Sequence, residues 1–173
     1  MKWPSKEERQ RFEIEGFIKL YKSFERGKGR SFVIDQYRDQ PDFVLRDRNT
    51  GERFGVELTS VYLSNRSVPD EHMKNEDVWI GIPFSQDDLN RYEKKIIEAV
   101  EKKVIKANTA RYDNSWPLIL SIYLNEYISI YMDRRYWTSF RDKYSNQLDA
   151  IEPFFEVVFW PLPNNEALSF RKK

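Results

Sequence analysis

The sequence contains no cysteine and only one histidine, His72. Without cysteine there can be no disulfide framework, no thiolate zinc site and no cysteine nucleophile. One histidine in a polar segment cannot supply the imidazole pair of a histidine zinc site, or of a nuclease built on two histidines. These absences exclude zinc sites built on thiolates or on paired imidazoles.

Several other features are absent or weak. No glycine-rich phosphate loop follows a predicted strand, since the glycines of the segment 26–30 follow a helix instead. The first eleven residues contain no apolar run that could serve as a signal peptide or membrane span, so we expect a cytoplasmic protein with no membrane partner. The net charge is only +1, from 29 basic and 28 acidic residues, so any basic surface must be local.

What the sequence does contain is typical of a packed protein. Its 173 residues suffice for one ordinary domain, and we expect a single domain over residues 1–173. The contents of 40% hydrophobic and 16% aromatic residues argue against disorder. The chain should therefore bury a core of its own.

Helical and extended patterns alternate along the chain. Ser5 and Glu8 form a capping-box pair at the start of a predicted helix that extends to Glu25. The segments predicted after it are extended runs at 31–37, 43–45 and 54–62, a long polar loop at 65–84, a helix at 86–111, a buried strand at 116–124, a helix at 133–148, and strands at 154–162 and 167–170. Turn residues at 49–51 join the second and third extended runs into a hairpin. This order predicts the α/β class.

The hairpin carries a motif. Pro41-Asp42, followed after fourteen residues by Glu57-Leu58-Thr59, resembles the signature of the PD-(D/E)XK nuclease superfamily, which includes many restriction and repair nucleases. Thr59 stands where the family usually has lysine. The resemblance spans roughly residues 5–124 and implies a restriction endonuclease-like α-β-β-β-α-β core, with a mixed central sheet flanked by helices. It also implies metal-dependent hydrolysis of phosphodiester bonds in nucleic acid, with DNA as the expected substrate and Mg²⁺ or Mn²⁺ as cofactor.

The chemistry of this reaction explains the residue types. A divalent cation neutralises developing charge and activates water, and carboxylate oxygens hold such a hard ion. Because strand residues alternate faces, Glu57 and Thr59 project together, and Asp42 on the adjoining strand can reach the same edge. The family pattern adds the backbone carbonyl of Leu58 to the metal ligands. In the simpler alternative, Asp42 is a turn residue after proline and Glu57 an ordinary solvent-facing strand residue.

Two further candidates follow from helical spacing. Glu13 falls on the same stripe as Phe17 of the first helix, and an acid on an apolar face is rarely buried without a partner. The resemblance gives Glu13 a place among the metal ligands; otherwise it is a boundary residue that reaches water or an arginine. Lys103 lies on the inward stripe of the second long helix and is the best substitute for the lysine absent at position 59. The alternative is a lysine whose stem lies on the core while its amine reaches solvent.

Three functions remain open at this point. The first is an active nuclease with catalytic residues Asp42, Glu57, Lys103 and Thr59, and the resemblance makes a homodimer plausible because many such enzymes cut both strands as pairs. The second is a nuclease-derived module that has lost catalysis and binds nucleic acid or protein, for which Thr59 is the best argument. The third is an interaction or immunity-type domain that contacts a protein partner through exposed aromatic residues.

Overall fold

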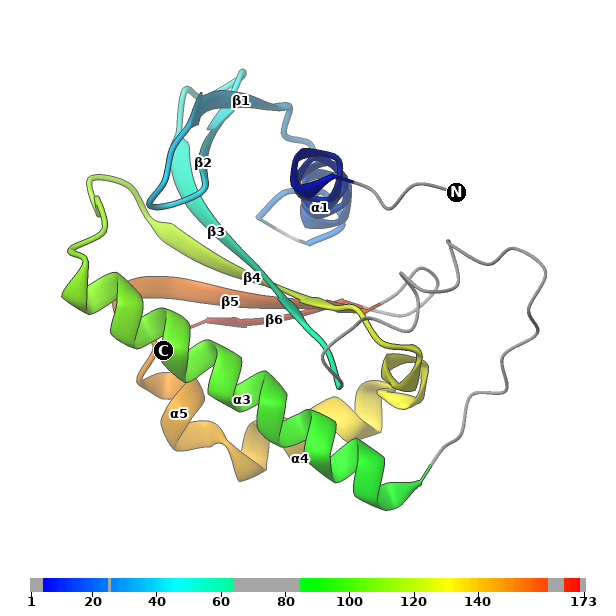
Figure 1. Cartoon of the computed structure of the whole chain (residues 1–173). Coiled ribbons are helices and arrows are strands. Elements are labelled where there is room, and N and C mark those ends of the chain that lie inside the picture. Colours follow the sequence, from blue (N-terminus) through cyan, green and yellow to red (C-terminus); the bar gives the residue numbers. More distant parts are fainter. Residues whose placement is uncertain (1–4, 25, 64–84, 162–166, 172–173) are drawn as a thin grey trace.

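The computed structural model describes residues 5–24, 26–63, 85–161 and 167–171 (Figure 1). Its elements in chain order are α1 (Lys6–Tyr21), β1 (Phe32–Tyr37), β2 (Phe43–Asp47), β3 (Arg53–Val61), α3 (Gln86–Thr109), β4 (Leu118–Leu124), the 3₁₀ helix η1 (Tyr127–Tyr131), α4 (Arg134–Lys143), α5 (Ser145–Asp149), β5 (Phe154–Pro161) and β6 (Leu168–Arg171). The α/β class is therefore confirmed.

Both long helices begin at side-chain caps. Ser5 accepts a hydrogen bond from the Glu8 backbone N–H at 3.1 Å, and Glu8 Oε2 accepts one from the Ser5 N–H at 2.6 Å. Ser85 caps α3 in the same way, accepting from the Asp88 N–H at 3.0 Å. Such caps satisfy backbone donors that have no partner within the helix. The helix starts predicted from the sequence are thus confirmed.

All six strands form one mixed sheet in the order β1-β2-β3-β4-β5-β6. The first three strands are antiparallel, β3, β4 and β5 run parallel, and β6 is antiparallel to β5. All seven residues of β4 are buried, which confirms the prediction of an interior strand over this segment. A continuous apolar run suits a strand that is covered on both faces.

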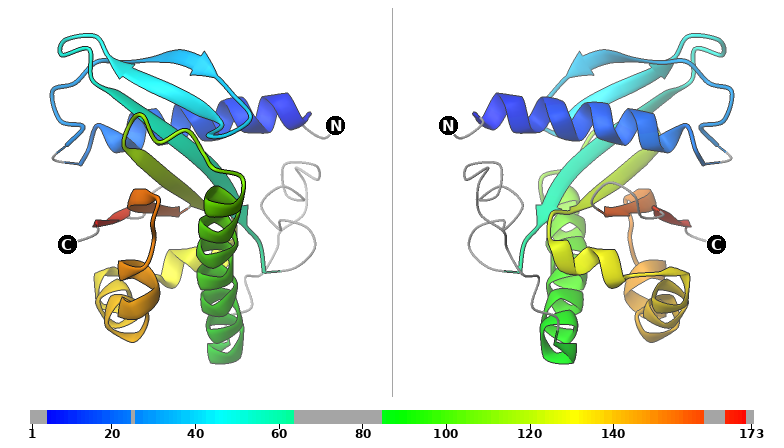
Figure 2. Two further views of the ribbon diagram at one scale, coloured as in Figure 1. Left: turned by 90° about the vertical axis from the view of Figure 1, so that its left-hand side faces the viewer. Right: turned by 90° about the vertical axis from the view of Figure 1, so that its right-hand side faces the viewer.

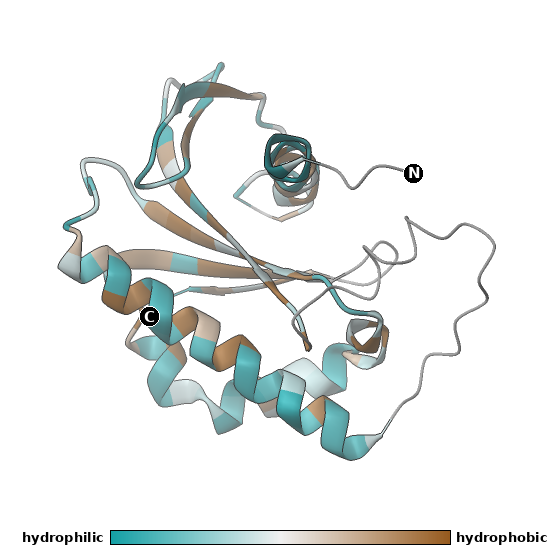
Figure 3. Ribbon diagram, in the orientation of Figure 1, coloured by the Kyte–Doolittle hydropathy of each residue, from teal (hydrophilic) through white to brown (hydrophobic). Residues whose placement is uncertain are grey.

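Helices cover the sheet on both sides. Figure 2 shows α1 crossing one face while α3 and α4 lie against the other. The core under α1 includes Ile14, Phe17 and Tyr21, and the core on the opposite face is built around Tyr92, Ile96 and Val100 of α3. Figure 3 shows mostly hydrophobic strands and helices that alternate hydrophilic and hydrophobic stripes, as expected for a sheet between two helical layers.

Three details differ from the sequence-based predictions. Helix α1 ends at Tyr21, before the predicted end, and the Ser23 hydroxyl donates to the Leu20 carbonyl at 2.6 Å in place of a continued helix. The predicted third helix is divided into α4 and α5, because Tyr144 between them leaves helical geometry and its hydroxyl donates to Glu93 of α3 at 2.9 Å. The 3₁₀ helix η1 was not predicted.

Two further expectations concern the predicted surface loop and membrane spans. The predicted surface loop at 65–84, with His72, lies outside the described residues. In the part of the chain that the structure describes, no helix is both long and apolar enough to cross a membrane.

Candidate active site

The hairpin of β2 and β3 brings the two motif carboxylates together. Phe43 of β2 pairs with Val56 of β3, and continuing this antiparallel register by one residue sets Asp42 opposite Glu57. Residues directly opposite each other in an antiparallel pair share a face of the sheet. The Leu58 backbone N–H donates to Asp42 Oδ2 at 2.7 Å, which holds the aspartate against β3.

Gly55 makes room for this arrangement. A Cβ at this position would lie 2.8 Å from Cγ of Pro41 and 2.6 Å from Cδ2 of Leu118, both closer than real Cβ atoms approach. The absence of a side chain at Gly55 therefore lets the Pro41 ring pack directly on β3. Since Asp42 follows Pro41 in the chain, this close approach helps set the position of the carboxylate.

Glu57 is almost fully buried, with 1% of its surface exposed, and three donors converge on one of its oxygens. Oε1 accepts hydrogen bonds from Lys103 Nζ at 2.6 Å, from the Tyr112 hydroxyl at 2.9 Å and from Lys106 Nζ at 3.4 Å. Among the described residues no donor reaches Oε2, although that oxygen is also buried. A buried carboxylate oxygen without a partner is costly, so this atom is ready to accept a cation or a further donor.

Lys103 contacts a second atom of the motif. Its ammonium group also donates to the Leu58 carbonyl oxygen at 2.9 Å. The inward stripe of α3 therefore delivers a positive charge to both Glu57 and the adjacent carbonyl. Lys103 is the residue predicted from the sequence to substitute for the motif lysine, which is replaced by Thr59.

Burial and charge set the protonation of these groups. Burial, followed by the negative charge of Glu57, raises the pKa of Asp42 above its ordinary value. Burial raises the pKa of Tyr112 to about 12, so its hydroxyl remains a donor at neutral pH. The hydrogen bond to Tyr112 raises the pKa of Lys106, which therefore keeps its charge. The site thus holds two adjacent carboxylates together with cationic and neutral hydrogen-bond donors.

Glu13 does not join this group. It accepts a hydrogen bond from the Ser60 hydroxyl, and Ser60 lies three residues from Glu57 in β3. Because side chains alternate along a strand, an odd separation places Ser60 on the face covered by α1, away from Glu57. The expected cluster of three carboxylates is accordingly absent: within residues 5–24, 26–63, 85–161 and 167–171, no three Asp, Glu, His or Cys side chains are grouped to hold a metal ion.

Sequence reasoning missed two members of the site, Tyr112 and Lys106. Tyr112 follows α3, where its N–H donates to the Ala107 carbonyl at 3.1 Å and Arg111 has a positive φ of 50°. This turn ends α3 and leads the chain to β4, and no periodic pattern in the sequence marks it. Lys106 is three residues beyond Lys103, so the two are neighbours on the surface of α3, and this spacing could have identified it.

A groove adjoins the site on the α3 side. It encloses about 360 Å³ and is lined by Thr59, Ser60, Val61 and Tyr62 from the end of β3 and by Lys95, Glu98, Ala99, Lys102, Lys103 and Lys106 from α3. Thr59 is half-buried there, as expected for a residue that alternates with Glu57. Lys103 and Lys106 line the groove and also contact Glu57, so the groove lies beside the carboxylates.

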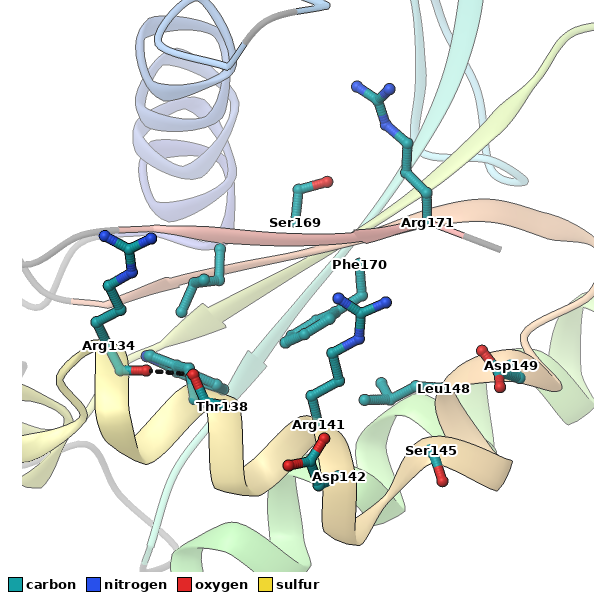
Figure 4. Close-up of a pocket in the computed structure, with 12 residues that line it drawn as sticks. Arg134, Thr138, Arg141, Asp142, Ser145, Leu148, Asp149, Ser169, Phe170 and Arg171 are labelled. Carbon is teal, nitrogen blue, oxygen red and sulfur yellow. Dashed lines mark hydrogen bonds between the residues drawn. The ribbon is translucent and has the colours of Figure 1, made fainter. Parts of the chain in front are cut away.

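A larger pocket of about 510 Å³ lies between α4, α5 and β6. Figure 4 shows Arg134 and Arg141 extending from α4 towards β6, with Phe170 and Leu148 between the layers. Arg171 and Ser169 point away from α4 and α5 in the same view. None of the motif carboxylates or their partners lines this pocket, so its size gives it no part in the chemistry predicted from the motif.

The residues present can be tested for their fit to a hard divalent cation. Mg²⁺ is commonly bound through one or two carboxylates together with water and substrate phosphate. Asp42, Glu57 and the Leu58 carbonyl offer two carboxylates and one carbonyl, and the buried Oε2 of Glu57 has no donor among the described residues. These oxygen ligands are of the kind that binds such an ion. In the structure Lys103 donates hydrogen bonds to two of the three groups, Glu57 and the Leu58 carbonyl.

Comparisons with protein-family models, with curated proteins and with solved structures gave no match to this chain.

Proposed function

We propose that this protein is a metal-dependent nuclease that hydrolyses phosphodiester bonds of nucleic acid, with DNA as the expected substrate. The observation that carries the proposal is the contact of the Lys103 ammonium with both Glu57 Oε1 and the Leu58 carbonyl, beside Asp42. A cationic amine next to two carboxylates is the combination that the resemblance implies. Here the amine comes from α3, because position 59 of β3 holds threonine in place of the motif lysine. The order of the elements from α1 to β4 also supports the restriction endonuclease-like core.

The expected cofactor is Mg²⁺ or Mn²⁺, held by Asp42, Glu57 and the carbonyl of Leu58. When bound, such an ion supplies neutralisation of phosphate charge and a more acidic water. In this proposal the protein orients the site: the Leu58 N–H fixes Asp42, and Tyr112 fixes one oxygen of Glu57. Lys103 lies close enough to act on the attacking water or on charge that develops on phosphate.

A second candidate, a catalytically inactive module that still binds nucleic acid, is favoured by one specific observation. Oε1 of Glu57 already accepts three donors, and two of them are ammonium groups. These cations compensate the buried carboxylate without any metal ion. Thr59 in place of the motif lysine is consistent with this alternative.

Calorimetric titration of Mn²⁺ and Mg²⁺ tests whether Glu57 belongs to a metal site, as the nuclease proposal requires. The unmodified protein should bind the ion, Glu57→Gln should bind it much more weakly, and Glu101→Gln, which changes an exposed glutamate of α3, should behave like the unmodified protein. Cleavage is then followed on plasmid DNA, linear duplex, single-stranded DNA and RNA with each ion. Binding with Glu57-dependent cleavage supports the nuclease. If Glu57→Gln binds the ions as well as the unmodified protein does, the proposed site is wrong.

A further inference from the structure

The groove between β3 and α3 is a basic channel on a nearly neutral protein. Its lining contains four lysines, Lys95, Lys102, Lys103 and Lys106, but one acidic residue, Glu98. The whole chain has a net charge of only +1. A local concentration of positive charge on such a protein focuses the field on one surface, which is the condition for attracting a polyanion.

Helical spacing places these ammonium groups in one row. Lys102 is seven residues after Lys95, and Lys106 is four residues after Lys102, so all three lie on one side of α3. Eleven residues of helix rise by about 16 Å. A row of this length matches the axial rise of about five phosphates of one DNA strand.

The opposite wall of the groove is the terminal half of β3. Strand β2 pairs with β3 only as far as Val56, whereas β4 pairs with it through Val61. Among the described strands, residues 57–61 therefore have a neighbour on one side only. Thr59, whose side chain shares a face of β3 with Glu57, lines this wall and offers a hydroxyl group to it.

The lysines retain capacity to bind an anion. An ammonium group has three donor hydrogens, and Lys95 uses one in a 2.7 Å bond to the Leu63 carbonyl. Lys102 and Lys106 are exposed, and Lys106 contacts Glu57 at 3.4 Å. The row therefore begins near Leu63 and ends beside Glu57.

We infer that this groove binds the phosphate backbone of one DNA strand and leads it to Glu57. The inference deepens the proposed function and rests on it for the class of ligand. Lys95, Lys102 and Lys106 contact successive parts of the backbone, and a phosphodiester at the end of the row lies beside Lys103. Contacts of this kind give affinity and strand direction without reading the base sequence.

The experiment measures binding in EDTA, so that neither metal ion nor cleavage is needed. Fluorescence anisotropy of a labelled 20-nucleotide DNA, single-stranded and as a duplex, is followed over a range of salt concentrations. The variants are Lys102→Gln and the double variant Lys95→Gln/Lys102→Gln. Lys94→Gln is the matched control, because Lys94 is an exposed lysine of the same helix that does not line the groove.

Each lost contact should lower the slope of log affinity against log salt by about 0.7 for the single strand or about 0.9 for the duplex. At 0.1 M salt this corresponds to about fivefold weaker binding of the single strand per contact, and about 25-fold for the double variant. Lys94→Gln should bind like the unmodified protein. Circular dichroism and thermal unfolding verify that each variant is folded.

The inference is overturned if the unmodified protein does not bind DNA, if Lys94→Gln weakens binding as much as Lys102→Gln, or if the double variant keeps the original slope. Failure of the proposed function has a different signature. In that case the DNA binding is groove-dependent but no nucleic acid is cleaved with either ion, and the inference stands. Metal-dependent cleavage together with unaltered DNA binding by the double variant would show that the groove does not bind DNA, while the proposed nuclease activity would stand.

Discussion

The ammonium group of Lys103 lies 2.6 Å from Oε1 of Glu57, a carboxylate with 1% of its surface exposed. An anion so deeply buried requires a nearby cation, and removal of one partner from such a pair is destabilising. The cation comes from the C-terminal half of α3, 46 residues away in the chain. The helix thus provides at Glu57 the positive charge that Thr59 cannot supply from the strand.

Lys103→Met tests this division of roles. The substitution keeps much of the apolar stem but removes the charge, so we expect turnover on DNA to fall by about 10²- to 10³-fold. Metal binding should survive, because the carboxylates remain. The free energy of unfolding should fall by about 1–3 kcal/mol, since Lys106 and Tyr112 still donate to Glu57.

Cleavage assays with Mg²⁺ and Mn²⁺, together with calorimetry and denaturant unfolding, measure the three effects of Lys103→Met. Lys94→Met is the control for turnover, because Lys94 is an exposed lysine of the same helix that does not line the groove. Full turnover in Lys103→Met would exclude the amine from the reaction.

Tyr112→Phe should weaken the fold through a single hydroxyl. The phenol is 5% exposed and donates to the buried Glu57 carboxylate at 2.9 Å. Hydrogen bonds to charged groups contribute about 1.5–3 kcal/mol, so unfolding in urea should show a loss of this size. Tyr37→Phe, at a side chain that is 69% exposed, should change stability by less than about 0.5 kcal/mol. Equal effects of the two substitutions would contradict a specific role for the Tyr112 hydroxyl.

Gly55→Ala should disturb the position of Asp42 from a distance. The new methyl group would meet Pro41 at 2.8 Å and Leu118 at 2.6 Å, and overpacking of this kind costs about 1–3 kcal/mol. Displacement of Pro41 moves the neighbouring aspartate, so Mn²⁺ affinity measured by calorimetry should also fall.

A double-mutant cycle with Pro41→Ala checks the cause of the Gly55→Ala effect. In that background one of the two clashes is relieved, so the added methyl group should cost less than in the unmodified protein. Purely additive free energies would show that contact with Pro41 is not responsible.

Glu93→Gln should produce a pH-dependent loss of stability. Burial alone would raise the pKa of Glu93, but hydrogen bonds from Lys143, Tyr144 and Tyr136 outweigh it and lower the pKa below 4.5. The folded state therefore favours the carboxylate, and its contribution is present above pH 4.5 and lost as the pH falls through the lowered pKa. We expect the free energy of unfolding of Glu93→Gln to be about 2 kcal/mol lower than that of the unmodified protein at pH 7. This difference should become smaller below pH 4.5.

Unfolding curves between pH 3 and pH 7 provide the measurement for Glu93→Gln. Glu101→Gln, at an exposed glutamate of the same helix, should show no such dependence. A loss of stability that is the same at every pH in this range would mean that the charge of Glu93 does not stabilise the packing of α4 on α3.

Features that depend on neighbouring residues could be predicted from the amino-acid sequence. Capping residues set the starts of α1 and α3, and a run of apolar residues identified β4 as an interior strand. Period-two alternation placed Glu57 and Thr59 on one face of β3, and helical spacing put Lys103 on the inner side of α3. These are properties of a single helix or strand, and the pattern of side chains within it specifies them.

Which of these faces meet depends on how the helices pack on the sheet, and local patterns do not specify it. Glu13 lies on an inward stripe as predicted, but α1 covers the opposite face of the sheet from Glu57, so the two carboxylates stay apart. Tyr112 reaches Glu57 because a turn after α3 redirects the chain, and Tyr144 interrupts a helix to reach Glu93. Periodicity fixes the direction of a side chain within its own element, whereas contacts between distant elements depend on how the sheet and its helices pack.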